Sequence, residues 1–165
     1  MSRGLSDEAF DRLYTEHAAG LLGFLTYQTG DRTLAEDIVA DTFERVLTAR
    51  RGWRGQSGEK TWLYAIAMNR LRDLARRRGA ESRAVDRVAA VPAPPDELGA
   101  VADRDFLKRA LQLLSDEERV VVALRFGADL TLGEIASVLH EPQTTVEGRL
   151  YRGLRRLRDA ASSTS

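Results

Sequence analysis

Apolar residues recur three and four positions apart along most of the chain, and this spacing predicts α-helices. In the N-terminal half the pattern predicts helices over about 6–28, 33–50 and 59–78. Thr33-Leu34-Ala35-Glu36 has the spacing of a capping box and is predicted to begin the second helix. The glycines between residues 52 and 58 predict a loop before the third helix. The N-terminal half is therefore predicted to be a small helical domain.

A proline-rich stretch separates this half from the helices that follow. Residues 79–102 include Pro92-Ala93-Pro94-Pro95 and lack helical periodicity, so they are predicted to form a flexible linker. The helical pattern resumes around Phe106. The next helix is predicted to be capped by Ser115 and to end at Gly127.

The C-terminal segment predicts a helix-turn-helix. Thr131-Leu132-Gly133-Glu134 is a further capping box that opens a short helix, and Pro142 separates this helix from the last one. The last helix is rich in arginine, and a basic second helix across a tight turn suits DNA recognition. We therefore predict an all-α protein of two small helical domains, at 1–78 and 103–165, with the helix-turn-helix in the second. The arginines of the last helix are Arg149, Arg152, Arg155, Arg156 and Arg158.

Charge is distributed unevenly along the chain. Hydrophobic residues make up 43% of the 165 residues, which is enough for a core, and the formal net charge is zero. Basic side chains are in excess over residues 50–78 and 119–165, and acidic side chains over residues 1–49 and 79–118. Because phosphate attraction depends on local patches, this pattern permits DNA binding despite the neutral total.

Several classes of site have no support in the sequence. The chain has no cysteine, which excludes disulfides, thiolate zinc sites and cysteine nucleophiles. His17 and His140 lack metal-ligand spacing, and there is no phosphate-binding glycine motif or nucleophile elbow. There is also no apolar run of about 18 residues and no signal-peptide core. We expect a cytoplasmic protein that is not an enzyme and that needs no metal or cofactor.

Two strings in a fixed order resemble a known family. Ala35-Glu36-Asp37-Ile38-Val39-Ala40-Asp41-Thr42-Phe43 lies in the second predicted helix, and Thr61-Trp62-Leu63-Tyr64-Ala65-Ile66-Ala67-Met68-Asn69-Arg70 in the third. With Trp53-Arg54-Gly55 between them and a C-terminal helix-turn-helix, the order is similar to that of the bacterial extracytoplasmic-function sigma factors of the sigma-seventy family. The resemblance covers residues 8–78 and 103–158. It implies that the first domain is sigma region two and the second is region four.

The resemblance implies that the second helix grips a coiled coil of the largest subunit of core RNA polymerase. By position, the contact surface comprises Asp37, Ala40, Asp41 and Glu44. The family often has glutamine or a similar polar group where this chain has Ala40. Without the resemblance, Asp37 and Asp41 would form a solvated acidic face, because residues four apart share one side of a helix.

The resemblance places recognition of the melted minus-ten element in the 52–60 loop and the third helix. Separated bases need a flat ring on which to stack and cations for their phosphates. Trp53 is the better stacking candidate, and Trp62 is expected in the core. The Asn69 amide both donates and accepts hydrogen bonds, so it suits a pocket for a flipped base of the non-template strand. The predicted minus-ten residues are Trp53, Arg54, Lys60, Asn69 and Arg70.

The resemblance assigns the last helix to the duplex minus-thirty-five element. Arginine bonds guanine bidentately, and threonine contacts a base or a phosphate. Glu147 stands where the family usually has lysine or arginine. Two roles are open for it: accepting from a cytosine amino group, or closing a capping box with Thr144. The predicted minus-thirty-five residues are Thr144, Thr145, Glu147, Arg149, Tyr151 and Arg152.

The resemblance also implies the function and the partners. A sigma factor binds core RNA polymerase, recognises the minus-ten and minus-thirty-five promoter elements and promotes DNA melting. Its partners are the polymerase, promoter DNA as duplex and as melted non-template strand, and an inhibitory anti-sigma factor. The alternatives are a free-standing helix-turn-helix transcriptional regulator, usually a dimer on a palindrome, and a helical adaptor that binds only proteins. The adaptor leaves the arginine-bearing helix and the tryptophan loop unexplained.

Overall fold

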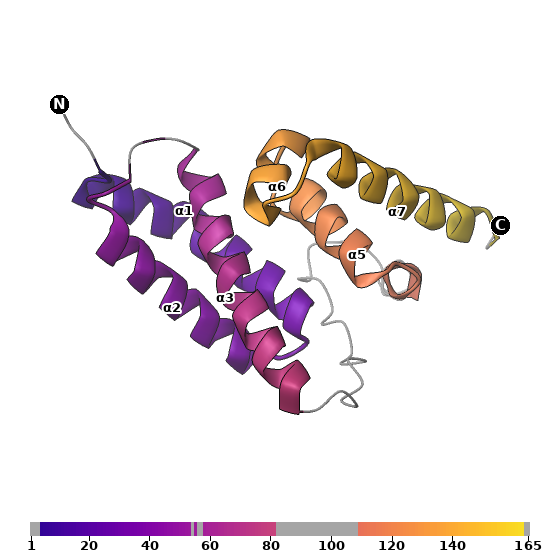
Figure 1. Ribbon diagram of the computed structural model, residues 1–165, viewed down its shortest axis with the longest axis horizontal. Helices are drawn as coiled ribbons and strands as arrows, with labels where there is room; N and C mark the ends of the chain where they lie inside the picture. Colours follow the sequence, from indigo (N-terminus) through magenta and orange to yellow (C-terminus); the bar gives the residue numbers. More distant parts are fainter. Residues whose placement is uncertain (1–3, 54, 56–57, 82–108, 164–165) are drawn as a thin grey trace.

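The computed structural model describes residues 4–53, 55, 58–81 and 109–163, which are helical apart from turns and short loops. None of these residues belongs to a β-strand. Figure 1 shows one group of long helices beside a second group that ends in the long α7. The predicted all-α fold with two helical units is confirmed. The elements are α1 (Asp7–Thr29), α2 (Arg32–Ala49), α3 (Glu59–Glu81), α5 (Asp116–Val122), the π-helical turn η1 (Ala123–Gly127), α6 (Leu132–Leu139) and α7 (Gln143–Ser163).

Capping residues explain the ends of the first two helices. The Ser6 hydroxyl begins α1 by accepting a hydrogen bond from the amide three residues on, at 3.1 Å. Gly30 ends α1 at φ 70°, a left-handed conformation that glycine adopts without steric cost. The Asp31 carboxylate begins α2 by accepting from the Leu34 amide at 3.1 Å. The predicted capping box at Thr33 is therefore wrong, because Asp31 is the cap and Thr33 already lies inside the helix.

Two capping boxes position the C-terminal helices as predicted. The Glu118 amide donates to the Ser115 hydroxyl at 3.1 Å, and the Ser115 amide donates to the Glu118 carboxylate at 3.0 Å. Thr131 and Glu134 form the same reciprocal pair at the start of α6. His140 ends α6 in the left-handed region at φ 56°, and α7 begins shortly after it. α6 and α7 therefore form the predicted helix-turn-helix.

Buried aliphatic side chains lie within both groups of helices and together form one continuous cluster. In the first group they lie between α1, α2 and α3, and in the second between α5, η1, α6 and α7. The first set includes Leu13, Leu21, Leu25, Ile38, Val46 and Leu63, and the second set includes Val121, Leu124, Leu130, Ile135, Val138 and Val146.

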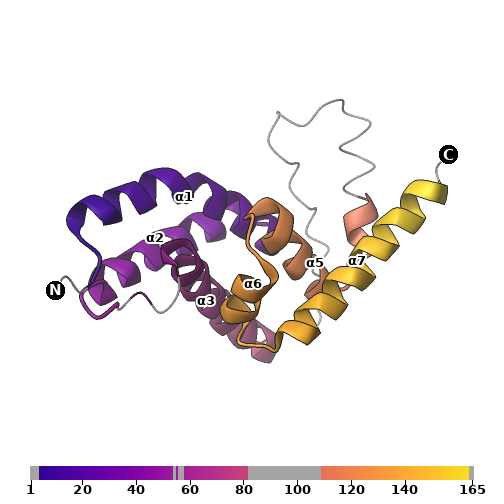
Figure 2. The same ribbon diagram turned by 90° about the horizontal axis from the view of Figure 1, so that it is seen from above.

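The two groups also pack against each other, chiefly through α3 and α6 (Figures 1 and 2). The Thr61 hydroxyl donates to the Glu134 carboxylate at 3.1 Å. The Arg72 guanidinium donates to the Leu139 carbonyl at 3.2 Å. About three helical turns separate Thr61 from Arg72, so both lie on one face of α3. This contact between the groups was not predicted from the sequence.

Most of the predicted linker lies outside the described residues. α3 continues to Glu81, so residues 79–81 are helical and the helix is longer than the predicted span of 59–78. Residues 82–102 and the start of the helix predicted around Phe106 lie outside the described ranges, and residues 109–112 are helical. No helix within the described part of the chain has the length and apolar character needed to span a membrane.

Candidate nucleic-acid interface

An acidic face and an apolar groove adjoin on α2. Asp37, Ala40 and Glu44 are exposed, and their spacing places them on one side of the helix. Ala40 also borders a groove of about 300 Å³ between α1 and α2. Sequence reasoning missed this groove, although small residues on the facing helices are the signal for it. Its lining residues are Tyr14, Ala18, Ala19, Leu22, Glu36, Val39 and Ala40.

Asp41 points between α2 and α3, unlike its neighbours on the acidic face. Its Oδ2 lies 3.1 Å from Arg45 Nε and 3.0 Å from Arg70 Nε. Asp41 and Arg70 have side chains that are 32% and 24% exposed, so water only partly screens their attraction. The structure thus brings together one residue predicted to bind polymerase and one predicted to bind minus-ten DNA.

Two tryptophans and Asn69 share one face at α3. The rings of Trp53 and Trp62 stack, with centroids 5.6 Å apart and planes 22° from parallel. Both rings pack against the buried core while staying partly exposed. Asn69 is exposed and lies about two turns beyond Trp62, on the same side of the helix. The aromatic surface next to Asn69 therefore consists of both rings, whereas Arg54 lies outside the described residues.

Lys60 lies on a different side of α3, about half a turn around the helix from Asn69. It is close to Glu134 on α6, the carboxylate that also accepts from Thr61. The pKa of Glu134 is lowered chiefly by the backbone hydrogen bond at Thr131, with smaller contributions from side-chain hydrogen bonds and from the charge of Lys60. The predicted minus-ten residues of α3, Lys60, Asn69 and Arg70, are thus spread around the helix and do not share one surface.

An exposed stripe runs along the solvent side of α7. Thr144, Glu147, Tyr151, Arg155 and Arg158 are all exposed, and helical periodicity places them within one narrow sector. Tyr151 is 67% exposed, which is high for an aromatic residue. The stripe combines a hydroxyl, a carboxylate, an aromatic ring and two guanidinium groups. It is suited to contacts with both bases and phosphates.

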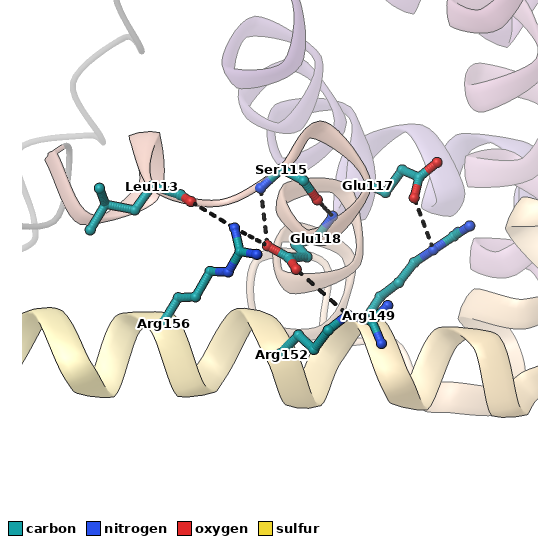
Figure 3. A network of polar contacts seen from close by, with 7 residues as sticks. All are labelled: Leu113, Ser115, Glu117, Glu118, Arg149, Arg152 and Arg156. Carbon is teal, nitrogen blue, oxygen red and sulfur yellow. Dashed lines mark hydrogen bonds and ion pairs between the residues drawn. The ribbon is translucent and has the colours of Figure 1, made fainter.

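Two arginines beside this stripe, Arg152 and Arg156, contact a buried carboxylate of α5 (Figure 3), although their side chains are 58% and 51% exposed. Glu118 has a side chain that is only 4% exposed. Its Oε1 accepts from the Ser115 amide and lies 3.4 Å from Arg156 Nη1, and its Oε2 lies 3.8 Å from Arg152 Nε. Arg156 also donates to the Leu113 carbonyl at 3.2 Å. These contacts fix the side of α7 that faces α5.

Arg149 is held in a similar way by two other acids. Its Nε lies 3.5 Å from Glu117 Oε2 (Figure 3), and its Nη1 pairs with Glu141. The Arg149 side chain is only 14% exposed, and Thr145 is half-buried. The predicted base contact of Arg149 stays a prediction, and it requires these ion pairs to open. Sequence reasoning missed the pairing.

The alternative role of Glu147 as a capping residue is not present in the structure. α7 begins at Gln143, and the Thr145 and Val146 amides donate to the Pro142 carbonyl. Thr144 therefore lies inside the helix and is not its cap. The Glu147 carboxylate instead accepts from the Gln143 side-chain amide at 3.3 Å. Both side chains are exposed, which leaves Glu147 available to a ligand.

Comparison with known proteins accounts for both halves of the chain. Residues 13–81 match the family model for sigma-70 region 2, and residues 110–159 match that for sigma-70 region 4. The ECF RNA polymerase sigma factor SigX of Bacillus subtilis is 30% identical over 162 residues, covering 92% of this chain and 83% of SigX. The ECF RNA polymerase sigma factor SigL of Mycobacterium tuberculosis is 33% identical over 158 residues, covering 88% of this chain and 85% of SigL.

Solved structures share the fold. The sigma factor RpoE of Bartonella quintana, in complex with the anti-sigma factor NepR, aligns with a TM-score of 0.77 at 24% identity. That alignment covers 94% of this chain and 98% of the other. CnrH, in complex with the cytosolic domain of CnrY, aligns with a TM-score of 0.69 at 24% identity, covering 97% and 92%. Both sigma regions are therefore present in one chain, in the order and fold of these proteins. The chain belongs to the extracytoplasmic-function sigma factors of the sigma-70 family, the subunits that direct RNA polymerase to promoters.

Proposed function

We propose that this sigma factor divides its contacts among three helices. The acidic face of α2 binds core RNA polymerase, the Trp62–Asn69 side of α3 binds the melted minus-ten element, and α7 binds the minus-thirty-five duplex. The observation that carries this proposal is that each helix packs against the core and exposes suitable side chains on its other side. These are carboxylates on α2, an amide on α3, and hydroxyl, carboxylate and guanidinium groups on α7. On this assignment residues 1–78 form region two and residues 103–165 form region four.

The polymerase surface consists of the exposed Asp37, Ala40 and Glu44 together with the groove beside Ala40. An exposed carboxylate attracts a basic partner, and an apolar groove takes an aliphatic side chain from the same partner. Asp41 contributes mainly by holding Arg70. A charge reversal at Asp37 tests this surface, with the same reversal at the exposed Glu16 of α1 as the matched control.

The minus-ten surface combines the stacked Trp53–Trp62 pair with the Asn69 amide. A base extracted from the duplex loses its stacking partners, and a ring face next to a hydrogen-bonding amide replaces them. Arg70, and Arg54 as the neighbour of Trp53 in sequence, then supply positive charge to this surface, whereas Lys60 lies on the other side of α3, close to Glu134. Binding of the separated non-template strand here favours DNA melting, because it stabilises the open form.

The minus-thirty-five surface is centred on the exposed stripe of α7. Thr144, Glu147 and Tyr151 face solvent near the start of the helix, where recognition helices meet base edges. Glu147 accepts from a cytosine amino group in this proposal. Thr145 and Arg152 flank the stripe. Arg152 contacts DNA only by leaving Glu118, and Arg149 only by exchanging its two glutamates for DNA.

The packed arrangement of the two groups has to open on a promoter. The centres of the two elements lie about 25 base pairs apart, or roughly 85 Å along B-form DNA at about 3.4 Å per base pair. α6 contacts α3 directly, and α7 extends only about 32 Å at about 1.5 Å per residue. One protein bound to both elements must therefore break the contact between α3 and α6. The sigma factor RpoE, which shares this fold, was solved in complex with the anti-sigma factor NepR, and this supports an anti-sigma factor as a further partner.

The decisive experiment is transcription with purified components. The chain added to core RNA polymerase is expected to start specific transcripts from promoters of its genome, and the Asp37 reversal is expected to abolish them while the Glu16 reversal does not. Absence of specific starts from every genomic template would refute the proposal. A free-standing regulator is not favoured, since both sigma regions match. We expect the factor to act in the cytoplasm and to have no enzymatic activity of its own.

A further inference from the structure

Glu118 is the one buried acidic or basic side chain among the described residues. A carboxylate that loses its water must be compensated by hydrogen bonds and by opposite charge. The Ser115 amide supplies a hydrogen bond, and Arg152 and Arg156 supply the charge from α7. Arg156 is fixed further by the Leu113 carbonyl. The two arginines therefore stabilise the folded position of Glu118 and are paired cations, although each side chain is about half exposed.

DNA phosphates compete for the same guanidinium groups. When an arginine leaves an exposed carboxylate, water takes its place at little cost. When an arginine leaves Glu118, the carboxylate stays behind in a buried position with less of its charge compensated. The contacts of Arg152 and Arg156 with Glu118 are therefore harder to exchange for phosphate than ordinary surface pairs.

Two other arginines of α7, Arg155 and Arg158, lie in a different setting. Arg155 and Arg158 belong to the exposed stripe, alongside Thr144, Glu147 and Tyr151. Arg155 directly precedes Arg156, yet the helix turns the two side chains about 100° apart. Two arginines adjacent in sequence thus differ in whether a buried acid holds them.

We propose that Glu118 is a positioning residue that keeps Arg152 and Arg156 against α5 and away from the DNA backbone, and that it thereby limits sequence-independent binding of duplex DNA. Glu117 and Glu141 restrain Arg149 in the same sense. The positive charge that remains available to phosphates is then that of Arg155 and Arg158, which share the stripe with the proposed base-reading side chains. Binding of duplex DNA therefore depends more strongly on the DNA sequence. This inference rests on the proposed role of α7 in binding duplex DNA.

The salt dependence of DNA binding measures the effect directly. Each phosphate contact adds about 0.9 to the slope of log affinity against log salt concentration. Glu118→Gln keeps an acceptor for the Ser115 amide but removes the charge that holds Arg152 and Arg156. The variant full-length chain is expected to bind a 30-base-pair duplex of arbitrary sequence more tightly at low salt, with a slope steeper by about 1 to 2. Between 50 and 200 mM salt, its advantage should shrink about 3.5-fold for each freed arginine.

Matched variants on α7 separate positioning from simple charge. Arg155→Gln removes an exposed cation and is expected to lower the slope by about 0.9. Arg156→Gln removes the neighbouring cation and is expected to leave the slope of the wild-type protein unchanged. In the Glu118→Gln background, Arg156→Gln should instead remove about half of the gained slope. Asp159→Asn, which removes an exposed negative charge from α7, controls for net charge and should not reproduce the gain.

The outcomes distinguish this inference from the function on which it rests. A folded Glu118→Gln protein with an unchanged slope would overturn the inference. An Arg156→Gln protein whose slope falls as far as that of Arg155→Gln would also overturn the inference. This comparison tests the inference even where Glu118→Gln fails to fold. If Arg155→Gln leaves the slope unchanged, α7 does not bind duplex DNA, and the proposed role of the helix fails together with the inference.

Discussion

The contact between α3 and α6 should control how readily the protein opens. Thr61→Val removes the hydroxyl that donates to Glu134, and Arg72→Met removes the guanidinium that donates to the Leu139 carbonyl. Both substitutions lie on α3 and keep most of the side-chain volume. The capping box of α6 stays intact, because Glu134 itself is unchanged.

The expected magnitude follows from these two hydrogen bonds. A hydrogen bond of this kind contributes about 1 kcal/mol net, because opening replaces it with bonds to water. The two bonds lie about 16 Å apart along α3, at about 1.5 Å per residue, so their contributions should add. The double variant Thr61→Val/Arg72→Met should therefore favour the open form by about 2 kcal/mol. That energy corresponds to a change of about 30-fold in the ratio of open to closed molecules.

Single-molecule energy transfer measures this ratio directly. The chain has no cysteine, so one can be introduced for labelling at the exposed Ala75 of α3 and one at the exposed Ser137 of α6, on the two helices that meet in the closed form. The wild-type protein should show mainly the high-transfer state that the packed arrangement predicts. The double variant should shift population to a low-transfer state. Arg76→Met serves as the matched control, because Arg76 is exposed on α3 and pairs with Asp73 rather than with α6.

Two results would refute this reasoning. A wild-type protein that is mainly in the low-transfer state would show that the contact does not hold the groups together. A double variant with unchanged helicity and a ratio within threefold of the control would show that these hydrogen bonds do not stabilise the closed form.

Three further predictions concern packing, pairing and pH. Gly153→Val should lower the melting temperature, because even a Cβ at this position would lie 3.1 Å from a methyl group of α5. Overpacking of this kind costs about 1–3 kcal/mol. An unchanged melting temperature would contradict the close approach of α7 to α5. In urea unfolding, Asp41→Asn and Arg70→Gln should be non-additive by about 0.5 kcal/mol, whereas Asp37→Asn and Arg70→Gln should add. Burial, followed by the charge of a nearby lysine, lowers the pKa of His17 below 6.5. The free energy of unfolding should therefore be fully retained above pH 6.5 and should decrease as the pH drops through the lowered pKa. In urea unfolding at several pH values, His17→Gln should lack this decrease.

Local sequence patterns predicted the helices and several of their ends. The capping boxes at Ser115 and Thr131 need only residues three apart, so they form wherever the helix begins. The same logic failed at Thr33, because Asp31 is an equally good cap and lies closer to the start of the helix. Local chemistry thus identifies candidate caps, and competition between neighbours selects one.

The roles of single charged residues were less predictable. Asp41 was predicted to bind polymerase, and in the structure it also pairs with Arg70 on another helix. The spacing of Asp37 and Asp41 shows that they share a face of α2. It does not show that α3 passes close enough to Asp41 to pair with it, because that depends on how the two helices cross.

The sequence by itself determined that this is an all-helical sigma factor with a basic C-terminal helix, because periodicity, caps and the ordered motifs are written in neighbouring residues. Only the tertiary structure decided which arginines of that helix are free. Arg155 and Arg156 are adjacent and chemically identical, yet one faces solvent and the other meets the buried Glu118. The packing of α5 against α7 makes that difference, and the contact of α6 with α3 likewise joins segments far apart in the chain. Such contacts depend on how whole helices pack, and no local pattern encodes them.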